Sequence, residues 1–481
     1  MSNPAASALP AAADRDVAAI VAPLIARARA AQESFANADQ ETVDRVVTAA
    51  GWAIVEPGRN RQLAEQAVRE TGLGNVADKL RKNRRKTLGL LRDLHGARSV
   101  GVLSEDPRTG ICEIARPVGV VAAITPSTNP AATPANNLIN ALKGRNAIIL
   151  APSPKGAGTC ASLLGYVWHE LDKVSAPRDL VQMLPPPASK ALAAELMRQA
   201  DLVVATGSPA NVRAAYASGT PALGVGAGNV AAIVTPNADF AATAVGIAES
   251  KTFDHATSCS SENSLVVVGD AWQPLLDALR RQGGVLAGAA EQAQLQRAMF
   301  PDGKLAPAFV AQAAPRLATL AGLSAPEYAD ARFIMVHEAA AAIGPQHPFS
   351  GEKLSPVLTL YRVADFDAAI AQVRAIYDYQ GKGHSVGVHG ASDAEILRLG
   401  FELPVCRVIV EQTHCVAVGG AFDNGLPFSL SMGCGSWGGN SFSDNLNYRH
   451  FLNITRIVRP IALRETSEEA LFADYWQRYG R

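Results

Sequence analysis

The chain has 481 residues, which is more than one hydrophobic core usually holds, so we expect two or more domains. Its 44 Lys and Arg residues equal its 44 Asp and Glu residues, and this balance gives no reason to expect nucleic acid or an anionic membrane as a partner. Hydrophobic residues make up 48% of the chain, yet no apolar run approaches the roughly 18 residues of a membrane span. The composition therefore predicts a globular, cytoplasmic protein.

The first hundred residues show the spacing of amphipathic helices. Apolar positions recur with the helical period, and Asp or Asn stands near several predicted starts, where its side chain can cap the first turn. The predicted helices cover residues 16–36, 40–54, 59–70 and 75–93. The apolar stretch Val17–Ala26 imitates the core of a secretion signal, but Asp14, Arg15 and Asp16 precede it, so we interpret it as part of the first helix.

After Ser99, short β-branched runs alternate with helix-length segments. This alternation is typical of βαβ units and parallel sheets. A first set of strands is expected at 119–125, 147–151, 180–184, 202–206 and 231–235. A second set is expected at 264–268, 332–336, 357–363, 385–389 and 407–411. The pattern predicts an α/β fold with two α/β domains in series that divide near residues 236–250.

The segment from Asn424 to Asn445 is rich in Gly, Ser and Asn. Its residues 433–439, GCGSWGG, satisfy the glycine pattern of a dinucleotide-binding loop, but no clear strand–helix–strand unit follows. We predict instead that this backbone packs closely against a ligand or a neighbouring loop.

Six cysteines are scattered along the chain, without the spacing to each other or to His that a zinc site needs, so no metal is expected. Cys259 stands on a loop of small residues just before a predicted strand, where a thiol can be accessible to a substrate, as a nucleophile requires. His255 precedes it by one helical turn. This histidine would lower the pKa of the thiol if the loop were helical, and otherwise it is a polar loop residue.

Several motifs occur together in a fixed order. They are TPSTNP at 125–130, GRNA at 144–147, ATGS at 205–208, PALGVGAGN at 221–229, the loop 250–264 around Cys259, EKLSPV at 352–357, GHS at 383–385 and GCGSWGGNS at 433–441. With them, the chain from residue 16 to about 460 resembles the CoA-acylating branch of the aldehyde dehydrogenase superfamily. It is similar to the aldehyde dehydrogenase half of bifunctional aldehyde–alcohol dehydrogenases, and more so to stand-alone acylating enzymes for succinate semialdehyde and sulfoacetaldehyde.

The resemblance implies an aldehyde-dehydrogenase-like α/β fold with three parts. Residues 1–240 would form the N-terminal helices and a Rossmann-type NAD(P)-binding domain, to which part of 432–481 returns. Residues 241–431 would form the catalytic domain, and residues 432–481 a C-terminal segment with a small oligomerisation arm. A homodimer or homotetramer is expected.

The resemblance also implies the chemistry. Cys259 would attack an aldehyde, the resulting thiohemiacetal would give its hydride to NAD or NADP, and the thioester would pass to coenzyme A. Thr128 or Asn129 would supply an amide or hydroxyl donor to the oxyanion, and His384 would either assist deprotonation of CoA or shape the cofactor site. Hydrolytic relatives carry a water-activating Glu where this chain has Gly224, and the missing base favours transfer to CoA over hydrolysis.

A strand, a turn of small residues and a helix start meet at Thr206, Gly207 and Ser208, which suits a pyrophosphate because free N–H groups face the anion. Glu352 matches the family glutamate that holds the nicotinamide ribose. The remaining cofactor-binding candidates by resemblance are Thr125, Ser127, Thr128, Gly226 and Met432. Ala151 stands where many relatives have a ribose-binding lysine, so the choice between NAD and NADP stays open.

The resemblance favours a short anionic aldehyde, sulfoacetaldehyde, as substrate, with succinate semialdehyde or a plain short aldehyde such as propanal as the alternative. Candidate partners for the anionic group are Arg116, Arg449 and Arg456. A different class of function is a thiol acyltransferase that uses Cys259 as an acyl carrier and binds no nicotinamide.

Overall fold

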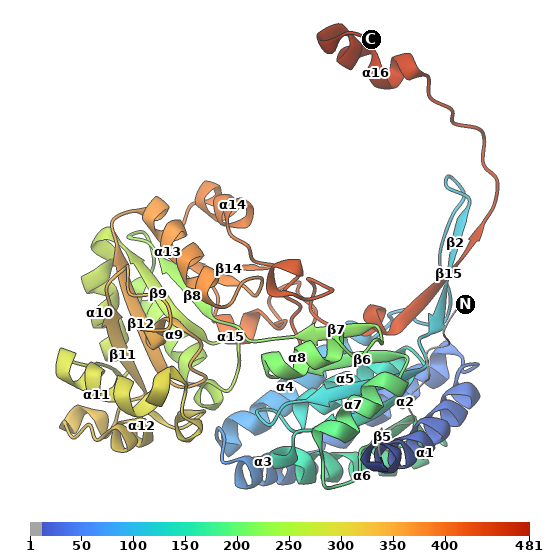
Figure 1. Cartoon of the computed structure of the whole chain (residues 1–481), viewed down its shortest axis with the longest axis horizontal. Coiled ribbons are helices and arrows are strands. Elements are labelled where there is room, and N and C mark those ends of the chain that lie inside the picture. The colour runs from blue at the N-terminus through green and yellow to red at the C-terminus, as the bar shows by residue number, and fades with distance from the viewer. Residues whose placement is uncertain (1–11) are drawn as a thin grey trace, which may run out of the picture.

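A computed structural model describes residues 12–481 and divides them into two α/β lobes with a protruding arm (Figure 1). The predicted N-terminal helices are confirmed as α1 (Ala12–Phe35), α2 (Gln40–Val55), α3 (Pro57–Thr71) and α4 (Val76–Leu94). Two of them begin with the expected caps, because Asp39 accepts a hydrogen bond from the backbone N–H of Thr42, and Asn75 accepts one from that of Asp78.

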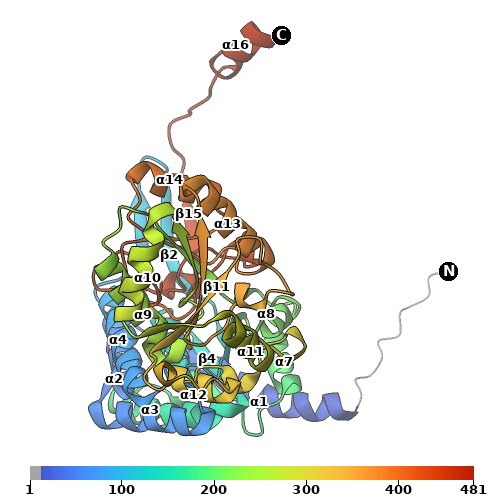
Figure 2. The same cartoon turned by 90° about the vertical axis from the view of Figure 1, so that its left-hand side faces the viewer.

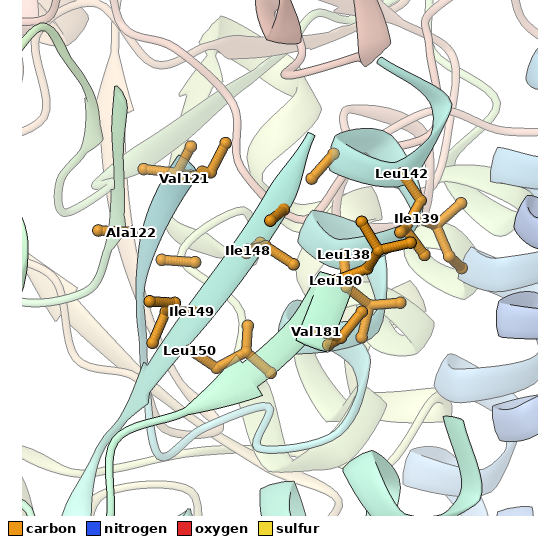
Figure 3. Close-up of a cluster of buried hydrophobic side chains, with 14 of the residues drawn as sticks. Val121, Ala122, Leu138, Ile139, Leu142, Ile148, Ile149, Leu150, Leu180 and Val181 are labelled. Carbon is orange, nitrogen blue, oxygen red and sulfur yellow. The ribbon is translucent and has the colours of Figure 1, made fainter. Parts of the chain in front are cut away.

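The first lobe contains a five-stranded parallel sheet of order β5-β4-β3-β6-β7. Its strands are β3 (Val120–Thr125), β4 (Ala147–Pro152), β5 (Val181–Met183), β6 (Leu202–Thr206) and β7 (Ala222–Val225), and its further helices are α5 (Ala132–Lys143), α6 (Ala157–Lys173), α7 (Lys190–Gln199) and α8 (Pro209–Tyr216). Figure 3 shows part of the core of this lobe, with apolar side chains of β3, β4 and β5 together with those of α5. Strands buried on both faces read as continuous apolar runs, which is why the sequence revealed β3, β4, β5 and β6, whereas β7 was not predicted.

The second lobe contains a seven-stranded parallel sheet of order β10-β11-β12-β9-β8-β13-β14. Its strands are β8 (Val230–Val234), β9 (Glu262–Val268), β10 (Gly284–Leu286), β11 (Phe333–Glu338), β12 (Val357–Val363), β13 (Val386–His389) and β14 (Val408–Val410), and its helices are α9 (Phe240–Thr252), α10 (Trp272–Arg281), α11 (Ala289–Met299), α12 (Ala314–Ala321), α13 (Phe366–Tyr379), α14 (Asp393–Glu402) and the short α15 (His414–Ala417). Both faces are covered, because Ala231 and Ile233 share a core with α13 and α14, whereas Ala232 and Val234 share one with α9 and α10.

One strand assignment from the sequence is wrong. The sequence pattern places the run at 231–235 in the first set of strands, but β8 pairs with β9 and β13 of the second sheet. A fully buried apolar run shows that a strand is covered on both faces, but it does not identify the strand's neighbours. The domain limits at 240 and 431 themselves stay a prediction.

The arm is an antiparallel sheet of β1 (Gly101–Asp106), β2 (Ile111–Pro117) and β15 (Leu452–Val458), so the chain returns from the C-terminal region to pair with β2. Beyond β15 an extended segment leads to α16 (Glu468–Tyr479), which stands away from both lobes in both views (Figures 1 and 2). Among the described residues, no helix is both long and apolar enough to cross a bilayer.

Candidate active site

A cavity of about 510 Å³ is lined by the carboxyl ends of β3 and β6 and by loops of the second lobe. Its walls come from Lys86, residues 125–129, Thr133, Ser153, residues 206–209, Asn211, residues 225–227, residues 257–260, Glu352, Leu354, Cys415, Gly419, residues 429–430 and Met432. All the predicted cofactor-binding residues line this cavity, as do Cys259 and Asn129. Ligands of α/β proteins bind at the carboxyl ends of parallel strands, and this cavity follows that rule.

The loop that presents Cys259 has an unusual backbone. Asp254, His255 and Ala256 all have left-handed φ angles of 51°, 52° and 59°, a conformation that non-glycine residues rarely adopt. The loop is held by the buried Asp254 carboxylate, whose Oδ2 accepts hydrogen bonds from the Nζ atoms of Lys79 at 3.1 Å and Lys82 at 2.6 Å. Burial alone would raise the pKa of Asp254, but Lys82 and Lys79 outweigh burial and hold this pKa below its usual range.

Cys259 is half-buried and lines the cavity, and it contacts His384, which does not line it. The distance from Cys259 Sγ to His384 Nε2 is 3.7 Å, within hydrogen-bond range for sulfur. Burial, with a smaller contribution from Glu352, raises the pKa of the Cys259 thiol well above its usual range. Burial, aided by Arg407, lowers the pKa of His384 to about 3. The resting pair is therefore a neutral thiol beside a neutral imidazole.

His255 does not lower the pKa of the Cys259 thiol, the role that a helical loop would have given it. Its backbone is left-handed, it lies outside the cavity walls, and it makes no hydrogen bond with Cys259 in the part of the chain that the structure describes. Burial also lowers the pKa of His255, so this imidazole supplies no positive charge at neutral pH.

The Asn129 amide is oriented by a lysine. Lys82 Nζ donates a hydrogen bond of 2.8 Å to Asn129 Oδ1. An ammonium group has donors only, so the oxygen of the amide must face Lys82 and the NH2 group must face the other way. Because Asn129 lines the same cavity as Cys259, this arrangement leaves the NH2 group available to an oxyanion.

Gly228 allows the close approach of two segments around the nucleophile. A Cβ atom at this position would lie 2.3 Å from the carbonyl oxygen of Cys259 and 3.0 Å from Cδ2 of His384. The backbone N–H of Gly228 also donates a 3.1 Å hydrogen bond to Oε1 of Glu352. Burial raises the pKa of Glu352 to about 8.

Gly224, at the position of the water-activating Glu of hydrolytic relatives, lies outside the cavity. Gly224 packs on α8, where a Cβ atom would lie 2.8 Å from Cε2 of Tyr216, and the cavity wall on this segment begins only at Val225. Glu352 is the one carboxylate among the residues that line the described cavity, and one of its oxygens is already held by Gly228.

The cofactor candidates lie where a nucleotide would need them. Ser208 caps α8 by accepting a hydrogen bond from the N–H of Asn211, and Gly207 has a φ of 156°, so a small-residue turn precedes a helix N-terminus. Oγ1 of Thr125, at the end of β3, is buried without a partner in the described chain, as expected of a hydroxyl that meets a ligand. The residues present therefore fit a dinucleotide. No cluster of three or more metal-binding side chains occurs among the described residues.

The glycine-rich segment at 433–439 packs against a neighbouring loop, as predicted. A Cβ atom on Gly383 would lie 1.9 Å from the carbonyl oxygen of Cys434, and one on Gly438 would lie 2.8 Å from that of Lys382. The segment thus supports the loop that carries His384.

The arginines proposed for an anionic substrate lie elsewhere. Arg116 is on β2, and Arg456, on β15, pairs with Glu113 in the arm. None of the three proposed arginines lines the cavity, and the only Lys or Arg among its lining residues is Lys86 of α4. The sequence alone did not single out Lys86, because it lies in a helix with many basic residues and only folding brings it to the cavity.

Comparison with known proteins agrees with this geometry. A model of the aldehyde dehydrogenase family matches residues 1–309. A sulfoacetaldehyde dehydrogenase (acylating) of Cupriavidus necator is 62% identical over 99% of this chain and 96% of its own length. One from Bilophila wadsworthia is 40% identical over 94% of this chain and 98% of its own. The crystal structure of an acetylating aldehyde dehydrogenase from Geobacillus thermoglucosidasius superimposes with a TM-score of 0.89 at 32% identity, covering 95% of this chain and 99% of that one.

Two parallel-sheet lobes around a cysteine-bearing cavity, together with these matches, define a protein of the aldehyde dehydrogenase class. The chain belongs to the acylating aldehyde dehydrogenase family. The predicted fold class is thereby confirmed.

Proposed function

We propose that this protein oxidises sulfoacetaldehyde with NAD or NADP and transfers the sulfoacetyl group to CoA. The observation that carries the proposal is the cavity that Cys259 lines together with Lys86, the only Lys or Arg among its described lining residues. The one carboxylate of this lining, Glu352, accepts a hydrogen bond from Gly228. The high identity to sulfoacetaldehyde dehydrogenases over nearly the whole chain supports the same substrate.

In this proposal Cys259 Sγ attacks the aldehyde carbon after losing its proton to His384 Nε2. The oxyanion of the thiohemiacetal accepts a hydrogen bond from the Asn129 amide, which Lys82 holds in the required orientation. Thr206–Ser208 would hold the pyrophosphate of the dinucleotide and Glu352 its ribose, and the bound dinucleotide would supply the hydride acceptor.

The acyl group on Cys259 then waits for a thiol. Water needs a base to attack a thioester, and the position of that base in hydrolytic relatives is Gly224, which packs on Tyr216 and carries no side chain. A CoA thiol entering the same cavity ionises far more readily than water, so it accepts the acyl group.

Lys86 supports an anionic substrate. Its Nζ donates a 2.6 Å hydrogen bond to the carbonyl oxygen of Gly419 and retains further donors for a ligand. Burial, with a contribution from Arg85, lowers the pKa of Lys86 to about 7, and Asp93 does not outweigh them. An anionic ligand beside the ammonium group would stabilise its charge. A sulfonate in the cavity would be such a ligand. A carboxylate would be another, which keeps succinate semialdehyde as the second candidate.

The test is an initial-rate panel with sulfoacetaldehyde, succinate semialdehyde and propanal, each with NAD+ or NADP+ and with or without CoA. We expect sulfoacetaldehyde to have the highest kcat/KM. Without CoA, we expect each enzyme molecule to form NAD(P)H once and then stop. Steady turnover without CoA would refute acyl transfer to CoA. A Cys259→Ala variant should lose acyl transfer and still bind the dinucleotide. If no nucleotide is reduced under any condition, the acyltransferase alternative stands.

A homodimer or homotetramer is part of the proposal. On α16, the side chains of Leu471, Phe472, Tyr475 and Tyr479 are all exposed, and so is Leu463 on the preceding segment. Apolar surface of this kind marks an interface, so the arm and α16 would pack on a second copy in the cytoplasm. Light scattering of the full chain would give the oligomer size.

A further inference from the structure

Gly419 lies in the wall of the cavity beside the ammonium group of Lys86. A Cβ atom at this position would lie 2.6 Å from Lys86 Nζ and 2.7 Å from the carbonyl oxygen of Ser429. It would also lie 3.5 Å from Sδ of Met432. Gly420 has a left-handed φ of 83° but Gly419 does not, so the backbone conformation of Gly419 does not demand glycine. The end of Lys86 thus occupies the place that a side chain on Gly419 would need.

The ammonium group is held in this place by the segment 415–432, which we call the wall segment because its residues 415, 419, 429, 430 and 432 line the cavity. The carbonyl oxygen of Gly419 accepts hydrogen bonds from Lys86 Nζ at 2.6 Å and from the backbone N–H of Ser429 at 3.0 Å. Lys86 itself is buried, so an ammonium group displaced from this carbonyl oxygen would lose the hydrogen bond without reaching bulk water.

The wall segment and α4 lie in close contact, which leaves Lys86 little room to withdraw. Arg85 of α4 donates a 3.3 Å hydrogen bond to the carbonyl oxygen of Val416. One turn after Lys86, a Cβ atom on Gly89 would lie 2.2 Å from Cδ1 of Phe428. A side chain added to the wall segment beside Lys86 would therefore meet a lysine that close packing holds in place.

An anionic substrate depends on this lysine. Lys86 is the only Lys or Arg among the described residues that line the cavity. A sulfonate or carboxylate group that is buried without a cation loses its hydration and gains no charge partner in return, which disfavours binding. Without the ammonium group, the same cavity would favour an aldehyde with an apolar tail.

We propose that Gly419 is a specificity-determining residue, because it leaves the room in which the Lys86 ammonium group meets an anionic aldehyde. The inference rests on the proposed function for the charge of the substrate. A side chain at this position would displace the ammonium group and would itself face the substrate, so the cavity would then favour a neutral aldehyde. Lys86 supplies the positive charge, and Gly419 determines whether that charge reaches the cavity.

The test compares two thiol reagents of similar size that differ in charge, sulfonatoethyl methanethiosulfonate and propyl methanethiosulfonate. Their rates of reaction with Cys259 are measured below about pH 7, where Lys86 is charged, by mass spectrometry of the peptide that contains Cys259. The ratio of the two rates cancels any change in the fraction of thiolate. Because a hydrogen bond to a charged group is worth about 10-fold or more, we expect the ratio of anionic to neutral reagent to fall by about 10-fold or more in Gly419→Ala.

The matched control is Gly425→Ala on the same wall segment. No described heavy atom lies within 4 Å of a Cβ atom on Gly425, so this variant should keep the parent ratio. A folded Gly419→Ala protein that keeps the parent ratio would refute the inference, even if the parent protein prefers sulfoacetaldehyde. If the ratio falls as expected but the parent protein shows no preference for sulfoacetaldehyde over propanal, the proposed substrate is wrong and the role of Gly419 stands.

A double variant identifies the neighbour that makes glycine necessary, the Lys86 ammonium group or the carbonyl oxygen of Ser429. If the ammonium group is the cause, Lys86→Met/Gly419→Ala should melt like Lys86→Met, and its reagent ratio should agree with that of Lys86→Met within about twofold. If the double variant unfolds, or loses more of the ratio, the contact with Ser429 is the cause and the inference is refuted. This comparison decides the matter even if Gly419→Ala alone fails to fold.

Discussion

The strongest prediction concerns Lys86 and the charge of the substrate. Lys86→Met removes the only Lys or Arg among the lining residues of the described cavity and keeps an unbranched side chain of similar length. A hydrogen bond to a charged group is worth about 1.5–3 kcal/mol, and every 1.4 kcal/mol is about tenfold in affinity or rate. We therefore expect the ratio of kcat/KM for sulfoacetaldehyde to kcat/KM for propanal to fall by about 10- to 150-fold.

The pH dependence of the same ratio makes the test sharper. Burial lowers the pKa of Lys86 to about 7. A lysine is charged below its pKa, so in the parent protein the preference for the anionic aldehyde should be greatest below about pH 7 and decline above it. Arginine stays charged at all accessible pH values, so Lys86→Arg should flatten the profile while keeping part of the preference. Taking the ratio of two aldehydes cancels the titration of Cys259 and Glu352.

Two outcomes would refute this reasoning. One is a Lys86→Met protein that loses activity equally on both aldehydes, because the lysine would then serve the structure or the chemistry and not substrate charge. The other is a parent ratio that rises with pH. A thermal melt serves as control, since the carbonyl oxygen of Gly419 loses one of its two donors in the variant and keeps the backbone N–H of Ser429.

Three further predictions follow from the site. Asn129→Ala should lower kcat by about 100-fold or more with dinucleotide binding unchanged, because it removes one oxyanion donor; an unchanged single-turnover rate would exclude that role. Gly228→Ala should lower the melting temperature and the rate, because its Cβ would lie 2.3 Å from the Cys259 carbonyl oxygen, whereas Gly165→Ala, with nothing within 4 Å of its Cβ, should be tolerated. Asp254→Asn should lower the free energy of unfolding by about 3–5 kcal/mol in urea melts, because it leaves buried ammonium groups uncompensated; a loss below about 1 kcal/mol would contradict this.

Much of the fold could be predicted because buried strands and amphipathic helices leave apolar patterns. The strands that the sequence did not reveal are those without such a pattern. β1 and β15 are mostly exposed, β2 is buried at only two of its seven positions, and β7 and β10 are only three or four residues long. Hydrophobic periodicity reports burial, so a strand that buries little in one chain gives little signal.

Some residues of the candidate site could also be predicted from the sequence, and others could not. Cys259, Glu352 and Thr206–Ser208 stand in recognisable local motifs, so their place in one cavity could be expected. Lys86 and Gly419 stand in no motif. They meet through a long-range contact between α4 and the wall segment, and a single sequence does not encode such a contact in its local pattern.

The ionisable groups at the site share one property that only the folded structure reveals. Burial moves each of them toward its neutral form, upward for the pKa values of Cys259 and of Glu352, the latter to about 8, and downward for those of Lys86, to about 7, and His384, to about 3. Charges in this cavity are therefore stable only as pairs, so a sulfonate would favour the charged lysine. Arg407 lowers the pKa of the Cys259 thiol but does not outweigh burial, so formation of the thiolate depends on transfer of its proton to His384.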